Sequence, residues 1–162
     1  ESYNRVLTVQ IKNNGGRYYS INAGFFYYYS EEVFNPDSGK YIIVDSLVDW
    51  RNLCFTTKDI SVENVEKTNM EEVFINNGFN AGSVLTLNLY YNHYSSSMPK
   101  DSVIISLYTY SRSGYLYKRS VFQQNKSQDD IFAEPAIVYN NINGGLGIFA
   151  GYTEKSILIP YK

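Results

Sequence analysis

The chain has 162 residues, a formal net charge of −2, 44% hydrophobic residues and 19% charged residues. This length suits one domain with a substantial hydrophobic core. Because no basic block accompanies the slightly negative charge, the chain lacks the electrostatic footprint of a general nucleic-acid-binding protein, and we expect no nucleic-acid partner. Its longest apolar run, at residues 23–29, is far too short for a helix that spans a bilayer.

Aromatic residues make up 17% of the chain, and 17 residues are tyrosines. Tyrosine favours strands and packs well when its ring is half-buried and its hydroxyl is wet. The composition therefore favours sheets over a helical bundle. The single cysteine, Cys54, cannot form an internal disulfide, so packing alone must hold the fold together.

The chain begins with a regular alternation at Tyr3–Lys12, where Leu7, Val9 and Ile11 share one face. This pattern predicts a half-buried strand. A turn at residues 13–16 and a long aromatic strand at Arg17–Ser30 follow, so the N-terminal residues predict a β-hairpin.

Three consecutive tyrosines, Tyr27–Tyr29, place rings on both faces of that second strand. Aromatic packing against neighbouring strands is the ordinary interpretation. The functional alternative is a stacking surface for a sugar or another flat ligand.

A Pro-Asp-Ser-Gly turn at Asn35–Gly39 precedes a short predicted strand at Lys40–Asp45. The run Leu47–Thr57, which contains the only tryptophan, fits either a strand or a single helical turn. Further alternation predicts strands at Ser83–Tyr91 and Ser102–Tyr110.

One helix is predicted, from Arg112 to about Asn125, with Ser111 as its N-cap. Aromatic rings recur at a spacing of seven at Tyr108, Tyr115 and Phe122, and Lys118, Arg119 and Gln123 are expected to face outward. Gly114 weakens this prediction because glycine is a poor helix former.

The stretch Phe132–Thr153 contains the clearest turn signal. Ala136–Tyr139 predicts a strand after Pro135, and Asn140–Gly145 predicts a turn that leads into a glycine-punctuated return strand. Its glycines do not match a dinucleotide-binding fingerprint, and Ser156–Ile159 after them predicts a strand where that fingerprint requires a helix.

Few residues suggest catalysis or metal binding. His93 is the only histidine, and although Ser95–Ser97 and Asp101 are near in sequence, a catalytic triad is defined by geometry. His93 and Cys54 supply too few ligands for a zinc site. The carboxylates of Asp129, Asp130 and Glu134 lack the spacing of a calcium-binding loop.

Acidic pairs such as Glu31-Glu32, Glu71-Glu72 and Asp129-Asp130 are too dispersed to nominate a glycosidase pair. We therefore expect no enzyme activity, no cofactor and no metal, and no ligand-binding residue can be named from the sequence.

The C-terminal stretch FAEPAIVYNNINGGLGIFAGYT resembles the C-terminal signature of a family of Bacteroidetes envelope lipoproteins of unknown function. Genes of that family often lie beside TonB-dependent, SusC-like transporters. Three further segments are similar to the family pattern: Leu7–Tyr19, Phe74–Tyr91 and Ser111–Ser120. Gly114 departs from the pattern, which has a bulky residue at this position.

The resemblance implies an all-β, non-catalytic accessory protein of the bacterial cell envelope, at the outer membrane, in the periplasm or on the cell surface. It also implies that the chain is the C-terminal part of a longer lipoprotein. The immunoglobulin-like domain and lipidated cysteine of that family are not among these residues, so we expect membrane association only through such an anchor.

Together these observations predict a single β domain over residues 1–162, an antiparallel β-sandwich or distorted barrel of about eight to ten strands with one short helix. The expected function is a binding or accessory module that contacts a TonB-dependent transporter or a glycan. The alternative is a fimbrial or adhesin-like subunit that assembles through an edge strand.

Overall fold

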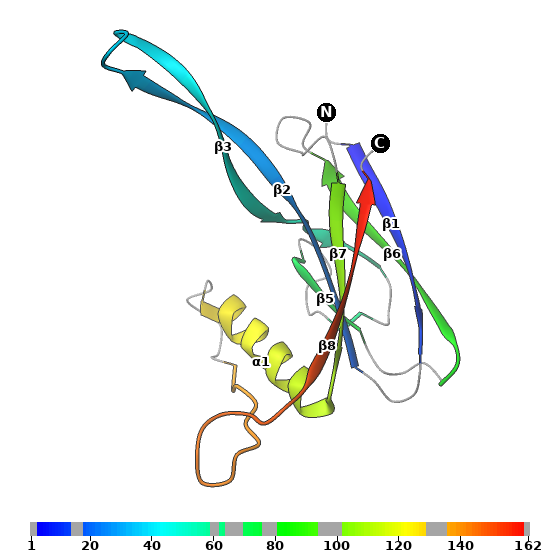
Figure 1. The fold of residues 1–162 in the computed structure, drawn as a ribbon. Coiled ribbons are helices and arrows are strands. Elements are labelled where there is room, and N and C mark those ends of the chain that lie inside the picture. Colours follow the sequence, from blue (N-terminus) through cyan, green and yellow to red (C-terminus); the bar gives the residue numbers. More distant parts are fainter. Residues whose placement is uncertain are drawn as a thin grey trace.

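Two antiparallel sheets and one helix form the fold in the computed structural model (Figure 1). The structure describes residues 3–13, 18–58, 62–63, 70–75, 81–93, 102–128 and 136–160. In chain order the elements are β1 (Tyr3–Lys12), β2 (Tyr18–Asn35), β3 (Lys40–Asn52), β4 (Phe55–Thr56), β5 (Glu72–Ile75), β6 (Val84–His93), β7 (Ser102–Tyr110), α1 (Arg112–Gln128) and β8 (Tyr152–Pro160).

The first sheet has the strand order β1-β6-β4, and the second has the order β3-β2-β7-β8, with β5 also paired to β2. Every strand pair among the described residues is antiparallel. The predicted antiparallel sandwich with one helix is confirmed. The barrel alternative is wrong, since the described strands form two open sheets.

The main hydrophobic core joins the inner faces of both sheets. Along β2, alternate residues such as Ile21 and Phe25 are buried in this core, and Leu87 and Leu89 enter it from β6. The period-two pattern of each strand therefore produces one buried face, as the alternation predicts.

The helix α1 packs on the outer face of the second sheet (Figure 1). Phe74 of β5, Tyr110 of β7 and Tyr115 of α1 are the buried residues of this second cluster, with Phe122 packed against them. Tyr115 and Phe122 face the sheet as predicted. Arg119 does not point freely outward, because its guanidinium lies 3.0 Å from the Glu63 carboxylate in an ion pair.

The predicted hairpin between the first two strands is wrong. All ten residues of β1 pair with β6, from Tyr3 opposite His93 to Lys12 opposite Val84, whereas β2 lies in the other sheet. This arrangement lets the apolar face of β1 pack against the inner face of β2, which two neighbours within one sheet cannot do. The turn residues 14–16 lie outside the described part of the chain.

The observed hairpin joins β2 to β3 and projects from the body of the molecule (Figure 1). Its turn is the predicted one at residues 35–39: the Asn35 side chain accepts from the Asp37 N–H at 2.9 Å, and Gly39 has a φ of 63°. The returning strand runs to Asn52, well beyond the predicted end at Asp45. Leu47–Thr57 is therefore mostly strand.

Gly24 explains how the sole tryptophan packs on this hairpin. A Cβ atom at Gly24 would lie 2.5 Å from the Arg51 carbonyl oxygen and would enter the Trp50 ring. The indole thus covers the glycine on the neighbouring strand, and its N–H donates to the Asn52 side chain at 2.8 Å. Glycine is required here because any side chain would displace the ring.

The predicted C-terminal hairpin is only partly present. A turn occurs at residues 143–144, and Gly144 has a φ of 75°, but residues 136–151 form no strand. The Asn141 side chain accepts from the Phe149 N–H at 2.8 Å and donates to its carbonyl at 2.9 Å. This side chain satisfies backbone groups that a strand ladder would otherwise pair. The strand predicted at Ser156–Ile159 is confirmed within β8.

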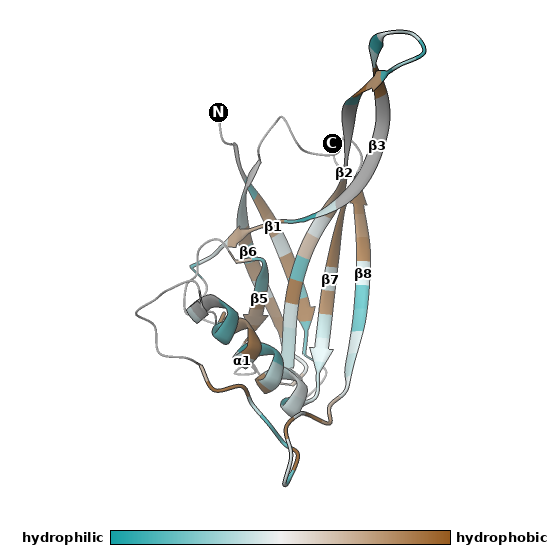
Figure 2. Cartoon of the chain, turned by 90° about the vertical axis from the view of Figure 1, so that its left-hand side faces the viewer, coloured by the Kyte–Doolittle hydropathy of each residue, from teal (hydrophilic) through white to brown (hydrophobic). Residues whose placement is uncertain are grey.

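Strand β8 forms one edge of the second sheet, and all of its residues are exposed. Figure 2 shows that its C-terminal half is hydrophobic and its N-terminal half hydrophilic. Within the described residues, no helix is both long enough and apolar enough to cross a membrane.

Candidate functional site

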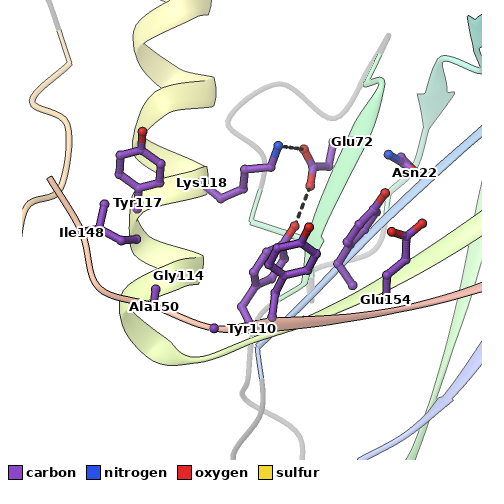
Figure 3. A pocket seen from close by; sticks show the side chains of 12 residues that line it. Asn22, Glu72, Tyr110, Gly114, Tyr117, Lys118, Ile148, Ala150 and Glu154 are labelled. Carbon is purple, nitrogen blue, oxygen red and sulfur yellow. Dashed lines mark hydrogen bonds and ion pairs between the residues drawn. The ribbon is translucent and has the colours of Figure 1, made fainter.

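A pocket of about 430 Å³ lies on the outer face of the second sheet, between α1 and the segment that leads into β8 (Figure 3). We call it the tyrosine pocket, and it is lined by Asn22, Glu72, Tyr108, Tyr110, Gly114, Tyr117, Lys118, Ile148, Ala150, Gly151, Tyr152 and Glu154.

Three tyrosine rings from adjacent strands form the floor of the pocket. Tyr108 and Tyr110 stack with centroids 6.1 Å apart and an interplanar angle of 18°. Tyr152 lies opposite Tyr110 in the strand register, with centroids 6.0 Å apart. Tyr110 is buried, whereas Tyr152 is 65% exposed. The exposed ring is therefore held in place by two others, which makes it a rigid surface for stacking.

One face of α1 forms the wall. Gly114, Tyr117 and Lys118 follow the spacing i, i+3, i+4, which places them on the same side of a helix. Figure 3 shows Tyr117 and Ile148 at one end of the pocket and Asn22 and Glu154 at the other. An apolar end and a polar end thus lie on either side of the tyrosine rings.

Ser111 connects the start of α1 to the segment before β8. Its Oγ accepts from the Gly114 N–H at 3.3 Å, which is the predicted N-cap, and from the Gly151 N–H at 3.3 Å. The backbone N–H of Ser111 also donates to the Gly151 carbonyl at 2.9 Å.

Gly114 lies at this contact between the helix and the segment before β8. A Cβ there would lie 3.3 Å from the Ser111 Oγ and 3.4 Å from both the Ala150 Cβ and the Gly151 carbonyl oxygen, so little space is left beyond the Cβ. The residue that weakens the helix prediction therefore lies where two walls of the pocket meet.

Glu72 is the centre of the polar contacts in the pocket. Its Oε1 accepts from the Ser20 hydroxyl at 2.6 Å and from the Tyr110 hydroxyl at 3.4 Å, and its Oε2 lies 3.8 Å from the Lys118 ammonium. Burial raises the pKa of Tyr110 well above its ordinary value, and the nearby Glu72 charge adds to this rise. Tyr110 therefore stays protonated and acts as a hydrogen-bond donor.

Glu154 lies at the polar end and is exposed. The Ser156 hydroxyl donates to its Oε1 at 3.0 Å, and this bond, with further ones from Ser106 and Tyr108, lowers the pKa of the Glu154 carboxyl. Burial raises the pKa of Tyr108, and the Glu154 charge adds to that rise. The pair therefore presents an ionised carboxylate beside a neutral phenol.

This arrangement is suited to holding a flat polar molecule. The rings supply stacking surfaces, while the hydroxyls, the carboxylates and the Lys118 ammonium supply hydrogen bonds. Among the described residues, no group of three or more histidine, cysteine, aspartate or glutamate side chains could hold a metal ion.

Of the candidate residues weighed from the sequence, Glu72 lies in the pocket, and the others that the structure describes lie elsewhere. His93 ends β6, but its side chain is outside the described part, as are Ser95–Ser97 and Asp101. Asp129, Asp130 and Glu134 are also outside it, as are the side chains of Tyr27–Tyr29. Cys54 is half-buried and lies between β3 and β4.

The sequence does not mark the pocket residues as a site. Two signals were present: the same-face pair Tyr108 and Tyr110 in one strand, and Tyr117 beside Lys118 on the helix. Neither indicates a pocket without the pairing of β7 with β8, which brings Tyr152 opposite Tyr110 from a distant part of the chain.

Comparison with known proteins gives one match. The model of the family described as Domain of unknown function (DUF4249) matches residues 3–157, which is nearly the whole chain. No curated protein and no solved structure shows significant similarity to the chain.

Proposed function

We propose that this chain, which belongs to the DUF4249 family of domains of unknown function, is a non-catalytic binding module that holds a glycan in the tyrosine pocket. The observation that carries the proposal is the exposed Tyr152 ring, fixed against two further rings and surrounded by hydrogen-bonding groups. Sugars combine apolar C–H faces with a rim of hydroxyls, so they match a site with aromatic faces and polar edges.

The cellular setting of the proposal follows from the resemblance of the C-terminal stretch to Bacteroidetes envelope lipoproteins. In this setting the domain acts as an accessory to a TonB-dependent outer-membrane transporter and holds the glycan that the transporter imports. A lipid anchor elsewhere in the protein would keep it at the outer membrane. Pull-down of the full-length lipidated protein from envelope extracts tests the partnership: a transporter recovered in stoichiometric amount supports it, and recovery of the protein alone overturns it.

Binding to a panel of purified oligosaccharides, measured by calorimetry, tests the pocket itself. We expect Tyr152→Ala to weaken binding by about fivefold, because one aromatic stacking contact contributes about 1 kcal/mol. Thr153→Ala is the matched control, since Thr153 is also exposed on β8 but points to the opposite face. The proposal is wrong if no oligosaccharide binds, or if the two variants weaken binding equally.

A second candidate function is a structural subunit that assembles through β8. The observation in its favour is an exposed edge strand whose apolar end includes Leu158, which is 63% exposed. Such an edge offers unpaired backbone groups to another strand. Sedimentation at increasing protein concentration tests this function: large assemblies that Leu158→Lys abolishes support it, and a monomer at all concentrations contradicts it.

A further inference from the structure

The distribution of charge in the tyrosine pocket indicates which sugars it accepts. Its lining contains two carboxylates, Glu72 and Glu154, and one ammonium, Lys118. That ammonium is already 3.8 Å from Glu72. Among the residues that the structure describes, no lysine or arginine forms an ion pair with Glu154. The pocket therefore carries an excess of negative charge.

The Glu154 carboxylate lies next to the exposed ring of Tyr152. Tyr152 and Glu154 are two residues apart on β8 and so share one face, with side chains about 7 Å apart along the strand. Hydroxyl donors hold the Glu154 carboxylate in its ionised form. A sugar stacked on Tyr152 can therefore place a ring substituent beside this carboxylate.

We propose that the tyrosine pocket selects sugars that carry a protonated amino group and disfavours acidic sugars. This inference rests on the proposed glycan-binding function. An ammonium substituent gains an ion pair with Glu154 and a favourable contact with the face of a tyrosine ring. The carboxylate of a uronic acid is repelled by the negative charge of Glu154. The Lys118 ammonium compensates this repulsion only weakly, because it already forms an ion pair with Glu72.

A matched series of oligosaccharides tests the inference: tetramers of N-acetylglucosamine, of glucosamine and of galacturonic acid, measured by calorimetry at slightly acidic pH. We expect the glucosamine tetramer to bind about tenfold more tightly than its acetylated form, and the galacturonic acid tetramer to bind most weakly. We expect Glu154→Gln to bring the ratio of the two glucosamine affinities close to one.

Glu32→Gln is the matched control, because it removes the same charge from an exposed residue of β2 on the projecting hairpin. It should leave the ratio unchanged. Equal affinity for the acetylated and free-amine tetramers, or a ratio that Glu154→Gln does not change, overturns the inference while glycan binding stands. Failure of all three tetramers and of the wider oligosaccharide panel overturns both.

Discussion

The hydroxyl of Tyr115 links α1 to the sheet. Removing this hydroxyl is the sharpest test of the contact between the helix and the sheet. The Tyr115 ring is only 2% exposed and packs against Tyr18 and Phe74, with centroids 5.0 and 5.8 Å away. Its hydroxyl donates to the Glu63 carboxylate at 2.9 Å and lies 3.3 Å from the Ile75 carbonyl oxygen. Tyr115→Phe removes these hydrogen bonds and keeps the ring.

The expected loss of stability follows from these contacts. A hydrogen bond to a charged group contributes about 1.5–3 kcal/mol, and one to a neutral group about 1 kcal/mol. Glu63 keeps its ion pair with Arg119 at 3.0 Å, which reduces the penalty of leaving the carboxylate without the phenol. We therefore expect Tyr115→Phe to lower the free energy of unfolding by about 2 kcal/mol, or the melting temperature by about 6 °C.

Urea unfolding, followed by circular dichroism and by the fluorescence of Trp50, measures this loss. A double-mutant cycle with Glu63→Gln isolates the contribution of the hydroxyl–carboxylate pair. Tyr115→Ala should cost more, about 3–5 kcal/mol, because it also removes the ring. A change in stability of less than about 0.5 kcal/mol for Tyr115→Phe would contradict this role of the hydroxyl, and so would an effect that is the same with and without the Glu63 carboxylate.

Three further outcomes follow from the structure. Burial raises the pKa of Tyr115 above its ordinary value, so the stability that its hydroxyl contributes is complete below about pH 10 and is lost as the pH rises toward the folded-state pKa. The loss of stability caused by Tyr115→Phe in urea unfolding should therefore shrink by about 1 kcal/mol between about pH 8 and about pH 11. A loss that stays constant over this range contradicts the prediction. Ser111→Ala should lower the free energy of unfolding by about 1 kcal/mol, because the N-cap and the link to Gly151 are both lost, whereas Ser113→Ala in the same turn serves as a control with a small effect. Gly24→Ala should displace the Trp50 ring, shift the fluorescence of this only tryptophan and cost about 1–3 kcal/mol; Gly151→Ala, where an added Cβ has nothing within 4 Å, should do neither.

Local patterns predicted the strands well where one face of the strand is buried. The alternation at residues 3–12 corresponds to β1, and Leu87 and Leu89 of β6 are buried on the side that the pattern indicates. The Asn35–Gly39 turn and the Ser111 cap were also correct. These features depend on short-range sterics and hydrogen bonds, which neighbouring residues determine.

Strand partners were not predictable in the same way. The glycine-rich residues 13–16 are a strong turn signal, yet the strands on either side of them belong to different sheets. Partner choice depends on which apolar faces can pack against each other across the whole domain, and β1 finds its backbone partner in β6, far along the chain. The tyrosine pocket was missed for the same reason, since its floor needs the pairing of β7 with β8.

Gly114 shows how a residue that is unfavourable locally can lie at a close tertiary contact. In an isolated helix it costs about 1 kcal/mol relative to alanine. In the fold it lies where the first turn of α1 meets residues 150–151, and two hydrogen bonds between Ser111 and Gly151 hold the same two segments together. A bulky side chain at this position would have to displace Ser111 or residues 150–151, because its Cβ alone would already be in contact with them. Because Gly114 and residues 150–151 all line the pocket, the size of the side chain at position 114 affects the width of the pocket.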